Sequence, residues 1–299
     1  MRDKNPFSIY DFLGYLFPGI VAIFVVFILR QSFSMQQYDF FACLHVHEII
    51  NLMQREMKLN WLEASMSIVV VAYIVGHLVA YASFLTVEFL AQKTLGYPSE
   101  YLLSDCNDSF WKKYFKVDDK SVVRLIYRIL VIIMLWPIAL FLFFMSERGL
   151  RGFLQAKLPQ YLIKAVMTKT FAMYQKLGLE HRSVNDKIDF HRVIMHYVYL
   201  NIDNAQRKAD NYVALYGFLR AICLILTLFY DVIAVNAVYT LRYLCNDKVE
   251  AEFSWFILIL LISGFVVCNL LYLGFVKFYR RFTLENFMAL ITEKEIQEH

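Results

Sequence analysis

Ionisable and polar side chains inside apolar stretches are the residues of this sequence with the clearest chemical potential. Asp231 lies near the centre of the apolar run 221–241, where inserting a carboxylate into a bilayer costs about 2.5–3.5 kcal/mol. Thr227 and Arg220 precede it by four and eleven residues, so all three share one helix face. This polar stripe predicts a water-filled path or an interhelical charge pair. The alternative is a packing role, in which Asp231 meets Arg220, His77 or a serine of a neighbouring helix.

A second polar stripe lies in the apolar run 61–90. Tyr73, His77 and Tyr81 recur at every fourth residue, and Glu88 continues their face eleven residues after His77. The stripe could line the same path, although a neutral histidine bonded to tyrosine is also a common packing solution. Glu88 lies close to the end of the run, so we expect it at the membrane interface.

A ridge of small residues runs beside this stripe. Ala72, Gly76 and Ala80 are spaced by four residues. Small side chains at this spacing let two membrane helices approach closely, so the ridge predicts a tight helix crossing.

Residues for metal or covalent chemistry are sparse. Cys43, His45, His47 and Glu48 cluster, but an H-x-H pair shares a face only in an extended backbone, and no second ligand pair is near. The five cysteines are odd in number and have no C-x-x-C spacing. The sequence has no Gly-rich phosphate loop, G-x-S-x-G or H-E-x-x-H motif. We therefore expect no metal, no cofactor and no enzymatic activity.

The composition indicates an integral membrane protein. The 299 residues are 59% hydrophobic and 19% charged, with a mean hydropathy of +0.48. Soluble domains are less apolar and more charged. The net charge of +4 is too small to indicate nucleic acid and suits basic loops that face an anionic lipid leaflet.

Five apolar segments approach the length of about 20 residues that a membrane helix needs. They are 10–29, 61–90, 129–145, 221–241 and 254–278. The third is short and has Pro137 at its middle. The sequence therefore predicts an all-α, integral membrane helical bundle with four to five membrane segments.

The loop charges decide between two topologies. If 129–145 enters and leaves on one side, most lysines and arginines face the cytoplasm, as the positive-inside rule favours. If it spans, that asymmetry is weak. Both topologies place residues 147–210 and the C-terminus in the cytoplasm.

The segment 147–210 predicts a cytoplasmic helical hairpin. It divides the chain into 1–146 with membrane segments one to three, 211–282 with segments four and five, and a C-terminal tail, 283–299. The second arm has a seam of apolar and small residues at alternating spacings of three and four, which continues into segment four. This seam consists of Ile188, Met195, Val198, Ile202, Ala205, Ala209, Tyr212 and Tyr216. It could pack on the other arm of the hairpin or around the axis of an oligomer.

Several short patches carry a resemblance to known sequences. They are Asn5-Pro6-Phe7, the run 10–19, Gly76-His77, the run 96–99 and the run 211–220. In these patches the chain resembles uncharacterised bacterial multi-pass inner-membrane proteins, some of which are associated with antiphage defence. The resemblance implies a bacterial inner membrane and a role in defence, and it transfers no functional residue.

Together these features predict an oligomeric inner-membrane protein that acts as a gated pore or as a membrane-perturbing effector or sensor. Its expected partners are the lipid bilayer, further copies of the chain and a cytoplasmic protein, and nucleic acid is not among them. One alternative is a non-conducting scaffold or assembly partner of a cytoplasmic effector. Another is a lipid-modifying membrane enzyme whose residues are scattered along the chain.

Overall fold

The computed structural model describes residues 11–34, 61–104, 109–115, 122–147, 154–178, 190–202, 205–247 and 252–293. Helices account for nearly all of them, and no strand occurs among them. By length and composition, four helices could cross a membrane: Phe12–Leu29, Met66–Leu103, Gln206–Val238 and Leu258–Thr292. A bent pair, Val122–Met134 and Trp136–Ser146, would make a fifth. The predicted all-α membrane architecture with four to five segments is confirmed.

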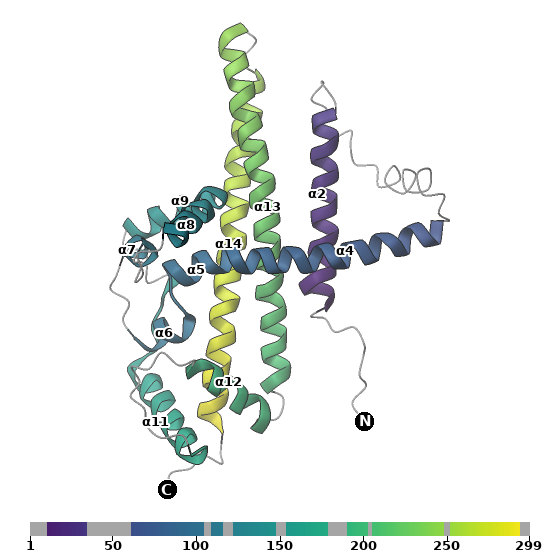
Figure 1. Cartoon of the computed structure of the whole chain (residues 1–299). Coiled ribbons are helices and arrows are strands. Elements are labelled where there is room, and N and C mark those ends of the chain that lie inside the picture. The colour runs from purple at the N-terminus through teal and green to yellow at the C-terminus, as the bar shows by residue number, and fades with distance from the viewer. Residues whose placement is uncertain are drawn as a thin grey trace.

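The two longest helices form the axis of the molecule. α13 (Ala205–Asp247) and α14 (Glu252–Thr292) lie side by side and run in opposite directions (Figure 1). Leu219 of α13 packs 3.2 Å from the position that a Cβ on Gly274 would take. Aromatic rings also pack across the interface of α13 and α14. The ring centroids of Tyr216 and Tyr279 lie 5.2 Å apart.

A transverse helix crosses this pair. α4 (Trp61–Ser83) continues through a π-helical turn, η2 (Phe84–Glu88), into α5 (Phe89–Thr94). Figure 1 shows α4 running across α2 (Phe17–Ser34), α13 and α14, and it contacts both α2 and α13. In a bilayer α4 therefore cannot share the orientation of the other three helices.

The crossing of α2 and α4 uses the small-residue ridge. A Cβ on Gly19 would lie 1.7 Å from the carbonyl oxygen of Ala72, and one on Gly76 would lie 1.8 Å from that of Tyr15. Ala72 is fully buried. No side chain fits at either glycine, so the two backbones are in direct contact. Ala80, the third member of the ridge, lies one turn further along α4 and is half-buried.

The third apolar segment bends sharply just before Pro137. α8 (Val122–Met134) and α9 (Trp136–Glu147) meet at Leu135 with an angle of 95° between them. Proline has no N–H for the helical ladder and is tolerated in the first turn of a helix, which is its place in α9. The segment begins earlier than predicted, because α8 starts at Val122 and not at Ile129.

A short helix holds the middle of α8 in place. α7 (Phe110–Phe115) presents Tyr114, whose hydroxyl donates to the carbonyl oxygen of Arg128 at 2.8 Å. The Arg128 guanidinium donates in return to the carbonyl oxygen of Tyr114. Burial raises the pKa of Tyr114, so its phenol stays protonated and keeps donating.

The apolar core has two main parts. The first lies among α5, α9, α13 and α14 and includes Leu90, Leu142, Cys223 and Phe275. The second lies among α6 (Pro98–Leu103), α11 (Gln160–Lys176), α12 (Phe190–Asn201) and the last turns of α14. Each of α11 and α12 contacts α14. The two arms of the hairpin are thus joined through α14.

Two boundaries differ from the prediction. Residues 283–292 continue α14, and their Phe287 and Leu290 are fully buried in the second core, so 283 does not begin a separate tail. The second arm is not one helix, because α12 ends at Asn201 and α13 begins at Ala205. Hydrophobic periodicity continues across this break and therefore could not reveal it.

The break also divides the seam. Met195 is half-buried and Val198 belongs to the second core, while Ile202 follows the end of α12. Beyond the break, Ala209 is buried, and Tyr212 and Tyr216 pack on aromatic rings of α14. Ala205 begins α13, and Ile188 lies outside the described residues. The partner of the seam along α13 is thus α14 of the same chain.

Candidate functional site

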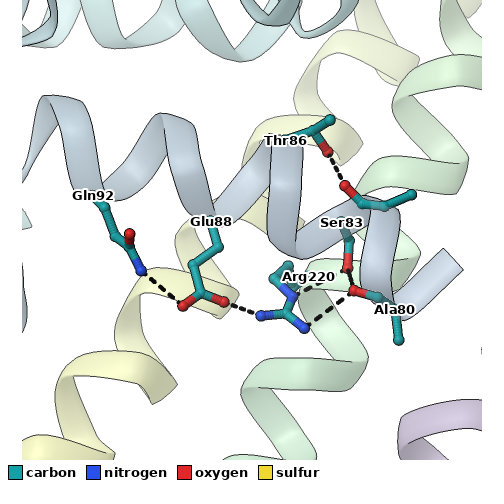
Figure 2. Close-up of polar contacts among 7 residues, drawn as sticks. Ala80, Ser83, Thr86, Glu88, Gln92 and Arg220 are labelled. Carbon is teal, nitrogen blue, oxygen red and sulfur yellow. Dashed lines mark hydrogen bonds and ion pairs between the residues drawn. The ribbon is translucent and has the colours of Figure 1, made fainter. Parts of the chain in front are cut away.

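A buried ion pair joins the transverse helix to α13 (Figure 2). Nη1 of Arg220 pairs with Oε2 of Glu88, and the two side chains are only 13% and 8% exposed. Nε of Arg220 donates to the Ser83 hydroxyl at 3.1 Å, and Nη2 donates to the carbonyl oxygen of Ala80 at 3.3 Å. The guanidinium of Arg220 therefore contacts three successive turns of the transverse helix, at Ala80, Ser83 and Glu88.

The local structure of that helix places these acceptors. Between Ser83 and Glu88 the backbone forms the π-helical turn η2, whose wider winding shifts Glu88 relative to a regular α-helix. Oε1 of Glu88 accepts from Nε2 of Gln92 at 2.9 Å, so both carboxylate oxygens are engaged. The ring of Phe84 lies 5.8 Å from Cζ of Arg220 and adds a cation–π contact.

A buried ion pair holds two elements in one relative position more than it stabilises the fold. We call the pair of Arg220 and Glu88 the latch. Desolvating two charges offsets much of their attraction, but separating them leaves an uncompensated charge in an apolar setting. Movement of α13 against η2 would break the pair and the two further bonds of Arg220. The arrangement therefore favours one relative position of these two elements over others.

Asp231 and Thr227 lie further along α13 and are not part of the latch. Oγ1 of Thr227 and Oδ1 of Asp231 are buried without a hydrogen-bond partner. The indole of Trp136, at the bend between α8 and α9, lies beside the Asp231 carboxyl group. Trp136 also packs on Tyr230, with ring centroids 5.7 Å apart. The bend therefore lies beside the acidic residue of α13.

The two polar stripes meet at one point. The structure brings Arg220 together with Glu88, but it pairs Asp231 with neither Arg220 nor His77. His77 is exposed and stacks on Tyr15 at 3.8 Å, while Tyr73 meets the His77 ring edge-on at 4.6 Å.

Tyr81 is exposed as well. Tyr73, His77 and Tyr81 thus belong to the outer side of α4 and its crossing with α2, and do not line a path inside the chain.

Three residues of these sites were not among the predicted ones. Ser83 and Gln92 flank Glu88, and Gln92 follows it by four residues, a spacing at which side chains on a helix interact. That spacing is the signal that could have identified Gln92. Trp136 could be found only as part of the predicted break, since no local pattern links it to Asp231.

Comparisons with known proteins give no further assignment. No protein-family model, curated protein or solved structure matches this chain.

Proposed function

We propose that this chain is a bacterial inner-membrane protein that assembles as a homo-oligomer and acts as a gated pore or a membrane-perturbing effector. In this proposal residues 147–210 and the C-terminus lie in the cytoplasm, where the helical unit formed by α11 and α12 receives the signal. A role in antiphage defence follows from the sequence resemblance alone.

The observation that carries the proposal is the Arg220–Glu88 latch. It lies on α13, a single helix that contacts α12 of the helical unit and continues into the apolar segment that contains Asp231. A displacement of the cytoplasmic unit would therefore move the helix that the latch holds. Release of the latch would free α13 from the transverse helix, which is the kind of two-state element that gating needs.

The continuity of α14 supports the same coupling. Its last turns complete the second core with α11 and α12, while its middle packs in the first core with α13. α14 thus links the two cores without an intervening loop.

A test is to purify the protein in detergent, determine its mass and measure ion flux after reconstitution in liposomes. We expect an oligomeric mass and a flux above that of protein-free liposomes. A strictly monomeric protein that passes no ions would exclude the pore.

A second candidate is a non-conducting membrane scaffold. It is favoured by the ion pair being complete within one chain, so that Arg220 and Glu88 need no second copy. If Asp231→Asn leaves cellular activity intact while substitutions in the seam at Val198 and Tyr216 abolish it, the scaffold is the better account.

A further inference from the structure

A small polar site lies between α13, α14 and the bend of α8–α9, apart from the latch. Its centre is Asp231, whose Oδ1 has no hydrogen-bond partner. An ionised carboxylate in apolar surroundings is costly unless a counter-charge or hydrogen bonds compensate it. Arg220 is eleven residues, or about 16 Å of helix rise, away, and it is engaged by Glu88.

Thr227 is the second unusual group of this site. Other helical threonines of the chain return their hydroxyl to their own backbone: Thr94 donates to Leu90 at 2.7 Å, and Thr170 donates to Val166 at 2.7 Å. Thr227 is fully buried, yet its hydroxyl has no such bond. Its nearest polar neighbours are the thiols of Cys223 and Cys268, which are weak hydrogen-bonding groups, so a stronger ligand can compete for the oxygen.

Thr227 and Asp231 are directed to one place. They are separated by one helical turn on α13, and both lie within electrostatic reach of the Cys268 thiol on α14. Trp136 borders the Asp231 carboxyl group on the side of the α8–α9 bend.

The atoms of this site indicate the class of ligand. Carboxylate and hydroxyl oxygens are hard donors that suit alkali and alkaline-earth cations. A divalent ion usually takes more than one carboxylate, and no group of three or more His, Cys, Asp or Glu side chains that could hold a metal occurs among the described residues. A single carboxylate matches a single positive charge.

We propose that Asp231 and Thr227 form a binding site for a monovalent alkali cation, with Na⁺ as the probe ion. The inference rests on the proposed pore function, since it names the ion that the site on α13 would take. Binding, however, can be measured without any flux. If the protein binds Na⁺ but passes no current, the proposed binding site stands and the proposed pore function is wrong.

The test measures the melting temperature of the detergent-solubilised full chain while N-methylglucamine chloride is replaced by NaCl at constant ionic strength. We expect a saturable rise of about 3 °C, because a ligand that binds only the folded state stabilises it. Asp231→Asn abolishes the rise. Thr227→Val, which keeps the shape of the side chain, raises the half-saturating Na⁺ concentration about tenfold.

Thr94→Val is the matched control, because Thr94 is equally buried but its hydroxyl bonds to its own helix. This variant keeps the full Na⁺ response. The proposal is overturned if the wild type melts at the same temperature in both salts, or if Asp231→Asn responds to Na⁺ as the wild type does. A Thr227→Val variant with an unchanged half-saturating concentration would also contradict it.

Discussion

Arg220 brings a permanent charge to a position where its side chain is only 13% exposed, and Glu88 is the group that neutralises it. Because arginine is not deprotonated in proteins, removing the carboxylate takes away the buried ion-pair partner of a permanent charge. We predict that Glu88→Gln lowers the free energy of unfolding by about 3–5 kcal/mol. Chemical unfolding in detergent micelles measures this change.

The surface pair of Lys113 and Glu100 provides the control. Its charged atoms lie 3.9 Å apart, and the Glu100 side chain is 56% exposed. Glu100→Gln should therefore change the free energy of unfolding by less than about 1 kcal/mol. Adding Arg220→Met to Glu88→Gln should recover most of the loss. Equal effects of Glu88→Gln and Glu100→Gln would contradict a latch.

At the residue scale the sequence identified the charged members of the site, Arg220 and Glu88, but neither their pairing nor the polar residues Ser83 and Gln92 around them. Arg220 and Glu88 could be selected because ionisable residues are rare in apolar helices. Their contact depends on where α4 crosses α13, which no local pattern specifies. In the packing alternative Asp231 would meet Arg220, His77 or a serine, but Trp136, on a segment far from it in sequence, lies beside it.

At the scale of elements, the crossing of α2 and α4 depends on backbone contact at two glycines. A methyl group on Gly76 would lie 1.8 Å from the backbone oxygen of Tyr15, an atom that cannot move without moving α2. We predict that Gly76→Ala forces the helices apart and lowers the melting temperature by several degrees, since about 1 kcal/mol corresponds to roughly 2–4 °C in a chain of this size class. Gly217→Ala has open space around its Cβ and should be neutral or stabilising.

The bend between α8 and α9 leads to a prediction about topology. We expect both ends of this segment on the same membrane face, because the bend reaches Asp231 and the loop charges favour a re-entrant segment. In a cysteine-free background, Lys120→Cys and Gly149→Cys should react with an impermeant maleimide from the same side of the membrane. Labelling from opposite sides would show that the segment spans.

Some features of the elements could be read from the sequence and others could not. Pro137 made a bend plausible because proline interrupts the hydrogen bonds of a helix, but membrane helices also tolerate proline. The small-residue ridge likewise indicated a close crossing, although not its partner α2. The seam was expected to be one helix, because heptad spacing continues through the break between Asn201 and Ala205. The same spacing fits packing against α14, another hairpin arm or a second chain.

At the scale of the whole molecule, α14 unites the two cores. We predict that deleting residues 283–299 destabilises α11 and α12, because it removes Phe287 and Leu290 from the second core. Each lost large apolar side chain costs about 2–5 kcal/mol. Limited proteolysis should then cleave within 154–202 many times faster. Deleting only 294–299 leaves the buried residues in place and should have little effect on cleavage.

The proposed gated pore is tested most directly by current recordings across planar bilayers that contain the purified full chain. Wild-type protein should give discrete conductance steps, and Glu88→Gln should raise the open probability several-fold, because the latch on α13 is lost. Glu100→Gln should behave as the wild type. If bilayers with folded, reconstituted protein pass no current with any of the three, or if Glu88→Gln and Glu100→Gln gate alike, the account is contradicted.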